Sequence, residues 1–130
     1  MSGTRIAEAC CMTPITSFRD LEVWQRSIDL VEACYRITAS LPRDERFGLG
    51  NQMRRATVSI SANIAEGHRR TRRAYLNHLS IALGSHAEFE TYVEVIRRLG
   101  LIEEILLAKA ETLQQSVGEL LHGLVRSLER

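Results

Sequence analysis

The stretch Asn51–Arg73 reads NQMRRATVSISANIAEGHRRTRR, and its pattern decides the fold of the chain. Read as a strand, it alternates Val58, Ile60, Ala62 and Ile64 with polar residues. However, about 20 residues without a turn signal are long for a strand and ordinary for a helix. On a helix, one sector about 100° wide collects Met53, Ala56, Thr57, Ile60, Ile64 and Gly67. The stretch therefore predicts an amphipathic helix.

The opposite side of this helix is also apolar. It carries Val58, Ala62 and Ala65, and Arg54 and Arg55 flank these residues. A helix that is apolar on two sides needs two partners. We therefore expect one side to pack inside a bundle and the other side, including both arginines, to contact a neighbouring subunit.

A second helix is expected before this one, from about residue 20 to 40, with Ser17 or Asp20 as its N-cap. The central helix then runs from about residue 45 to 66 and is expected to end at Gly67. The connection between the two is short and polar.

Two more helices follow the central one. Thr71 can cap a helix over about residues 72–99, and Gly100 can end it. The last helix covers about residues 102–128, with an apolar residue every three or four positions. Four long helices with short connections predict an all-α fold, an antiparallel up-down-up-down four-helix bundle.

The first helix carries two apolar stripes. The stripe assigned to the bundle core is Leu21, Trp24, Ile28, Val31 and Tyr35. The second stripe contains Val23, Leu30 and Ile37, and we predict that it contacts another subunit; the alternative is that it covers a loop. The predicted oligomer interface is therefore Val23, Leu30, Ile37, Arg54, Arg55, Val58, Ala62 and Ala65.

Composition sets the class of protein. The 130 residues suffice for one domain, expected over residues 17–130 behind a mobile tail at 1–16. Hydrophobic content of 45% and charged content of 25% disfavour disorder and membrane insertion. Three cysteines in no metal-binding spacing indicate a reduced, cytoplasmic protein. The net charge is only +1, but residues 43–78 hold eight arginines against three acidic residues.

No catalytic or cofactor-binding pattern is present. A di-iron bundle needs two Glu-x-x-His pairs, and the chain has one, Glu119 and His122. His86 lies one turn before Glu90 and could be a general base, but a partly buried histidine bonded to Glu90 or to another helix is the favoured interpretation. Phosphate-binding and hydrolase motifs are missing. We predict no metal, no cofactor and no enzymatic activity.

The basic cluster Arg69, Arg70, Arg72 and Arg73 is the best candidate for a binding site. It spans a helix junction, where free backbone N–H groups and guanidinium groups both suit phosphate. The alternative is a solvated turn in which Glu66 pairs with one of the arginines. No aromatic residues interleave with the cluster to stack bases.

Four motifs carry a resemblance to a known family: DLEVWQ at 20–25, LP at 41–42, QMRRATVSISANIAEG at 52–67 and ALGSHAEFE at 82–90. The chain resembles bacterial four-helix-bundle proteins first noticed as products of intervening sequences in 23S rRNA genes. That family is similar to the accessory variability protein of diversity-generating retroelements, a pentamer that works with a reverse transcriptase and RNA.

This resemblance implies a homopentamer, with RNA or DNA and a reverse transcriptase as partners. Together with the basic cluster it predicts a non-enzymatic, homo-oligomeric bundle that binds nucleic acid, RNA in particular. The alternative is a protein-interaction scaffold without nucleic-acid binding.

Overall fold

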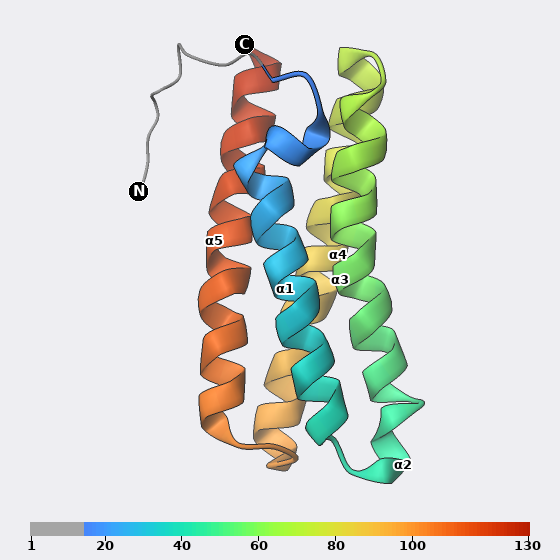
Figure 1. Cartoon of the computed structure of the whole chain (residues 1–130), viewed down its shortest axis with the longest axis vertical. Helices are drawn as coiled ribbons and strands as arrows, with labels where there is room; N and C mark the ends of the chain where they lie inside the picture. Colours follow the sequence, from blue (N-terminus) through green and yellow to red (C-terminus); the bar gives the residue numbers. More distant parts are fainter. Residues whose placement is uncertain (1–14) are drawn as a thin grey trace.

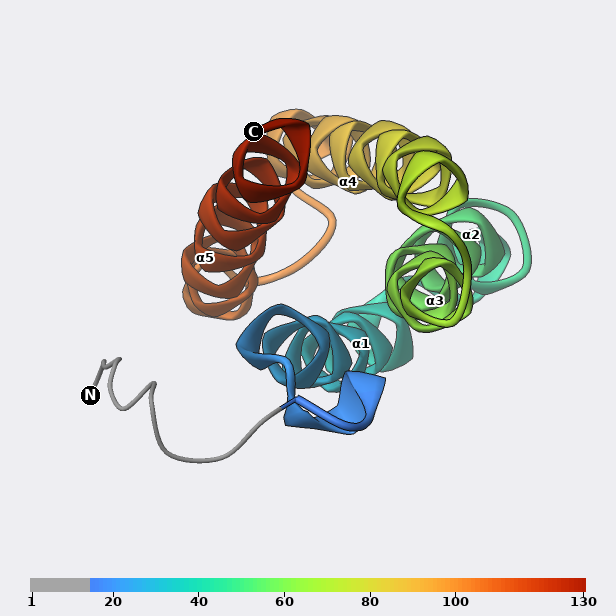
Figure 2. The same ribbon diagram turned by 90° about the horizontal axis from the view of Figure 1, so that it is seen from above.

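The computed structural model describes residues 15–130, which form helices joined by short connections (Figure 1). A 3₁₀ helix, η1, precedes the longer elements. In chain order the helices are η1 (Phe18–Asp20), α1 (Glu22–Ser40), α2 (Arg43–Arg46), α3 (Leu49–His68), α4 (Arg72–Leu99) and α5 (Glu104–Glu129). Seen end-on, the four long helices surround one core, each packed against its neighbours in chain order, and α5 closes the ring against α1 (Figure 2). The predicted four-helix bundle is confirmed.

The two ends of the bundle differ in which segments they bring together. At one end lie η1, the α3–α4 turn at residues 69–71 and the last turn of α5 (Figure 1). We call this the basic end, because it carries the predicted arginine cluster. The α2 end carries α2 and the α4–α5 connection. No helix within residues 15–130 is long and apolar enough to cross a membrane.

A polar network holds η1 at the start of the described chain. The Ser17 backbone N–H donates to the Asp20 carboxylate at 3.2 Å, and the Ser17 hydroxyl accepts from the Arg19 N–H at 3.1 Å. The Thr16 N–H also donates to Asp20, at 3.3 Å. Ser17 therefore caps η1, whereas α1 begins at Glu22. The expected mobile tail at 1–16 lies almost entirely outside the described residues.

The assignment of the two stripes of α1 is wrong. Val23, Leu30 and Ile37, predicted to contact another subunit, are 5%, 0% and 1% exposed within the single chain. They pack in the core, and Tyr35 of the other stripe is 50% exposed. The core stripe is interrupted by Ser27, whose buried hydroxyl hydrogen-bonds the Ser61 hydroxyl of α3 at 2.8 Å. Because the Ser27 hydroxyl has a hydrogen-bond partner on another helix, this polar residue is tolerated in the core. In the sequence, however, it made the core stripe look less apolar than the other stripe.

The central helix packs as predicted, but it ends differently. Met53, Ile60 and Ile64 are fully buried, so the predicted core side of α3 is confirmed. α3 continues past Gly67 to His68, because Gly67 is needed for close packing and not for a turn. A Cβ added at Gly67 would lie 2.8 Å from Tyr75 Cδ1 in α4. The expectation that Gly67 terminates the helix is therefore wrong.

The two caps predicted around α4 are confirmed. The Thr71 hydroxyl accepts a hydrogen bond from the Ala74 N–H at 3.3 Å and begins the helix. Gly100 has φ 63°, in the left-handed region that favours glycine, and its N–H bonds the Arg97 carbonyl at the end of α4.

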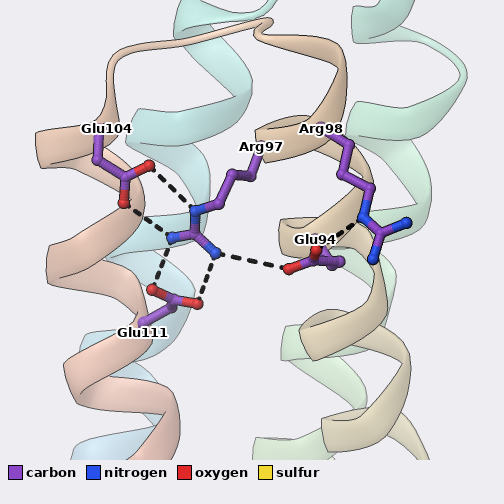
Figure 3. A network of polar contacts seen from close by, with 5 residues as sticks. All are labelled: Glu94, Arg97, Arg98, Glu104 and Glu111. Atoms are coloured by element: carbon purple, nitrogen blue, oxygen red, sulfur yellow. Dashed lines mark hydrogen bonds and ion pairs between the residues drawn. The ribbon is translucent and has the colours of Figure 1, made fainter.

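An ion-pair network joins α4 to α5 at the α2 end (Figure 3). The Arg97 guanidinium donates to both oxygens of Glu104 at 2.9–3.0 Å and to both oxygens of Glu111 at 2.7–2.9 Å. Glu94 lies 3.7 Å from Arg97 and also pairs with Arg98 at 2.8 Å. The hydrogen bonds that Arg97 donates to Glu104 and Glu111 raise the pKa of Arg97, and the same bonds to Glu104 lower the pKa of Glu104. The network ties α4 to α5 across the connection between them.

Candidate nucleic-acid interface

The predicted arginine cluster lies on the tight α3–α4 turn at the basic end. The Arg69 N–H bonds the carbonyls of Glu66 and Gly67, and the Arg70 N–H bonds Gly67 at 2.9 Å. Thr71 then caps α4. Two helix ends thus meet within three residues, and all four cluster arginines are exposed.

Two of the four arginines are engaged inside the chain. Arg70 pairs with Glu66 at 3.1 Å, as the alternative interpretation of the turn expected. Arg72 donates to the backbone carbonyls of Leu128, in the last turn of α5, and of Arg130, which directly follows the helix. Carbonyls at a helix C-terminus lack intrahelical partners and carry partial negative charge, so Arg72 stabilises the end of α5. Arg72 therefore contributes less to a binding surface than the sequence suggests.

Arg69 contacts an aromatic residue that the sequence analysis did not connect with it. Its guanidinium carbon lies 5.5 Å from the centroid of the Phe18 ring, and that of Arg19 lies 4.9 Å from the same ring. Trp24 packs against Phe18 with centroids 5.2 Å apart and planes inclined by 60°. Phe18 precedes Arg69 by about fifty positions, so only the packing of η1 beside α3 brings them together. No local signal in the sequence could have shown this contact.

An open depression of about 510 Å³ lies beside this aromatic and basic cluster. Its lining comes from η1, the outer side of α3 and the turn: Phe18, Ala62, Ala65, Glu66, Arg69 and Arg70. The short side chains of Ala62 and Ala65 leave the space open. The wall combines an aromatic ring, two guanidinium groups and one carboxylate.

A second polar contact supports the wall of the depression. His78 of α4 lies 4.0 Å from the Glu66 carboxylate through Nε2, and its Nδ1 is 2.9 Å from the Asn63 side-chain oxygen. Its ring is thus held between α3 and α4, in the second turn of α4. Glu66 thus has one contact from Arg70 of the turn and one from His78 of α4.

The predicted interface residues of α3 divide between two depressions. Arg54, Arg55 and Val58 line one of about 560 Å³ together with Tyr35, Asn51 and Ser59. Ala62 and Ala65 line the other, beside Phe18. Val58 is 45% exposed, and the Arg54 guanidinium carbon lies 5.7 Å from the Tyr35 ring centroid. The predicted outer side of α3 is thus left exposed by the chain itself. The predicted outer stripe of α1, in contrast, is buried in the core of the same chain.

His86 has a structural role. Its Nε2 donates to the backbone carbonyl of Gln114 in α5 at 2.7 Å. A Cβ at Gly118 would lie 2.9 Å from the same ring, so this glycine makes room for it. The hydrogen bond comes from another helix and not from Glu90, in agreement with one of the two favoured alternatives.

The isolated Glu-x-x-His pair does not gather further ligands. Glu119 and His122 are both exposed on α5. Within residues 15–130, no group of three or more His, Cys, Asp or Glu side chains is arranged to hold a metal ion. Cys34 is buried, and burial raises its pKa to about 11, so its thiol is protonated at neutral pH.

Comparisons with known proteins show the family of the chain through a family model and its fold through a solved structure. Residues 19–123 match the family model described as 23S rRNA-intervening sequence protein. A crystal structure of a protein of unknown function from the S23 ribosomal protein family of Bacteroides thetaiotaomicron superposes with a TM-score of 0.73 at 24% identity. The match covers 80% of this chain and 95% of that one. No curated protein matches the chain significantly.

Proposed function

Because the chain belongs to the 23S rRNA-intervening sequence protein family, we propose that it is a non-enzymatic, homo-oligomeric bundle that binds RNA through its basic end. The observation that carries this proposal is the convergence of exposed arginines from separate elements at one end of the molecule. Arg19 of η1, Arg69 of the turn and Arg73 of α4 are all exposed there. Guanidinium groups in such a cluster suit phosphate contacts.

The oligomer part of the proposal rests on the part of the outer side of α3 around Val58 and on the neighbouring flank of α1. Tyr35 and Val58 are large apolar side chains, 50% and 45% exposed, on two adjacent helices. Arg54 and Arg55 border them. A second copy covering this surface would bury apolar area, worth about 25 cal/mol per Å². The resemblance to pentameric relatives favours five subunits.

Assembly would increase the avidity for RNA of a site that binds weakly in a single chain. One chain offers few unengaged arginines and a net charge of +1. Cyclic symmetry repeats the basic end in every subunit, and one RNA strand can then contact several copies with greatly increased avidity. The same resemblance leads us to propose a reverse transcriptase as protein partner, and the cysteine pattern leads us to propose the cytoplasm as the location.

RNA binding is tested with a charge-matched pair of variants. The first changes Arg69, Arg70 and Arg73 to Gln; Arg72 is left in place because it caps α5. The control removes three exposed charges nearer the α2 end, by changing Arg36, Arg43 and Lys109 to Gln. Fluorescence anisotropy with single-stranded RNA at about 50 and 200 mM salt measures affinity and salt slope.

We expect the basic-end variant to bind more weakly and with a shallower salt slope than the wild type. The control variant should keep most of the affinity and most of the salt slope, because the three charges that it loses lie outside the basic end. Equal losses in the two variants would mean that only overall charge matters. If the wild type binds no RNA at low salt, the scaffold alternative takes the place of this proposal.

Assembly is tested by light scattering at micromolar concentration. The wild type should have several times the monomer mass of 14.7 kDa. Val58→Glu should lower that mass, because a charge on an apolar contact surface is costly to desolvate. A monomeric wild type would refute the oligomer.

A further inference from the structure

Two guanidinium groups lie over the ring of Phe18 near the surface. The guanidinium carbons of Arg19 and Arg69 lie 4.9 and 5.5 Å from its ring centroid, and Trp24 packs against the ring at 5.2 Å. Arg19 and Arg69 are exposed, so the cluster is reachable from solvent. Aromatic rings and guanidinium planes are the two kinds of surface on which proteins stack unpaired bases.

The depression beside Phe18 has the size for a base. It measures about 510 Å³, within the range of roughly 300–1,000 Å³ typical of small-molecule pockets. Ala62 and Ala65 on α3 keep it open on the side facing away from the core. A base can therefore enter from a strand that runs across the surface.

Glu66 determines which part of a nucleotide suits the depression. Its carboxylate pairs with Arg70 at 3.1 Å and so reduces the positive charge available there. The Glu66 carboxylate would repel a phosphate beside it and so offset part of the attraction of Arg69 and Arg70, whereas an uncharged base is not repelled. Phosphates are better accommodated by the exposed Arg73, in the first turn of α4 outside the depression.

We propose that Phe18 and Arg69 form a stacking site for an unpaired base of a single-stranded nucleic acid, with the base in the depression next to Glu66. The proposal rests on the proposed function, since it assumes that RNA binds at the basic end, and it adds which chemical group is recognised. A duplex keeps its bases stacked inside and cannot fill this site.

The test separates stacking from phosphate contacts by using two RNA probes. One is a uridine strand of about 12 nucleotides, within the range of known single-strand sites. The other is a strand of the same length whose ribose units carry no base. The wild type should bind the uridine strand at least about fivefold more tightly, because stacking on aromatic residues typically contributes a factor of this size or more per base.

Phe18→Leu is the central variant, because leucine keeps apolar contact with Trp24 but offers no ring for stacking. It should bind both probes with nearly equal affinity and an unchanged salt slope, since no phosphate contact is lost. Phe47→Leu is the matched control, because Phe47 is 79% exposed and directly follows α2, which lies at the opposite end of the bundle from η1. It should retain the wild-type preference.

Trp24 gives a second readout. It is the single tryptophan of the chain and packs directly on Phe18. Its emission should change when the uridine strand binds and remain unchanged with the base-free strand. Ala65→Leu should fill the depression and remove the preference while the oligomer mass stays the same. A lower mass for Ala65→Leu would instead assign this residue to the subunit interface and overturn the proposal.

The possible failures are distinguishable. If the wild type binds both probes equally, the stacking site is refuted while RNA binding by phosphate contacts stands. If Phe18→Leu keeps the wild-type preference for the uridine strand, the base stacks elsewhere and the assignment to Phe18 is wrong. If neither probe binds at low salt, the proposed function fails and the stacking site fails with it.

Discussion

Gly67 controls how closely α3 approaches α4 next to the basic turn, and Gly67→Ala measures that constraint. The added Cβ would lie 2.8 Å from Tyr75 Cδ1 and 2.8 Å from His78 Cβ, closer than side-chain carbons approach in folded proteins. The His78 atom is attached directly to the backbone, so it cannot swing aside by a change of rotamer. The two helices must therefore move apart or tilt.

The magnitude follows from two opposing effects. Alanine has a higher helix propensity than glycine by about 0.8–1 kcal/mol, which favours the variant. Overpacking by one carbon in a close contact costs about 1–3 kcal/mol, which disfavours it. The net expectation is a loss of about 0–2 kcal/mol in the free energy of unfolding.

Gly84→Ala is the matched control. Gly84 is exposed on α4, and a Cβ there meets no heavy atom within 4 Å, so only the propensity gain remains. The propensity effect is common to both variants, and the difference between them isolates the packing cost, about 1–3 kcal/mol.

Urea or thermal unfolding followed by circular dichroism measures both variants. We expect Gly84→Ala to unfold above the wild type, and Gly67→Ala to unfold at least about 3 °C below Gly84→Ala. If the two variants are equally stable, the contact between α3 and α4 at Gly67 is not as close as described. The explanation of why α3 continues through this glycine would then be wrong.

Three further predictions test the core, the ion pairs and the buried thiol. Leu30→Ala should cost about 2–5 kcal/mol in unfolding free energy because Leu30 is fully buried, whereas Tyr35→Ala should cost far less; the reverse order in urea unfolding would restore the original stripe assignment. Arg97→Gln should destabilise the chain at neutral pH. Because the pKa of Glu104 is lowered in the folded state, the ion pair stabilises the fold above the unfolded pKa of Glu104, about 4.3, and this stabilisation is lost as the pH falls through the lower folded pKa. The difference in urea midpoint between wild type and variant should therefore shrink in acid. A gap independent of pH would exclude this ion pair as the cause. Cys34, with its pKa raised by burial, should be alkylated by iodoacetamide only under denaturing conditions, as peptide mass spectrometry can show; rapid native labelling would contradict its burial.

The features predictable from the sequence were those that depend on residues close together in the chain. The apolar period of α3 placed Met53, Ile60 and Ile64 on one side, and the structure buries all three. Thr71 and Gly100 marked the limits of α4, because a side-chain cap and a left-handed glycine act within one helical turn. Short connections between four such helices leave few topologies other than the antiparallel bundle.

The orientation of α1 could not be predicted in this way. Periodicity shows which residues share a side, and both stripes of α1 satisfied it. Ser27 decided the outcome, because its hydroxyl meets Ser61 of α3, which makes a polar position acceptable in the core. Residue type alone likewise suggested that Gly67 ends α3, whereas Gly67 packs closely against α4.

For the candidate site, the sequence by itself determined that arginines gather at one junction, since Arg69 to Arg73 are neighbours in the chain. Only the tertiary structure decided which of them are engaged. Arg72 is occupied by the carbonyls at the end of α5, and Arg69 meets Phe18 of η1. These partners lie about fifty or more positions away, and side chains so distant in sequence meet only when burial of the apolar stripes has set the helices side by side.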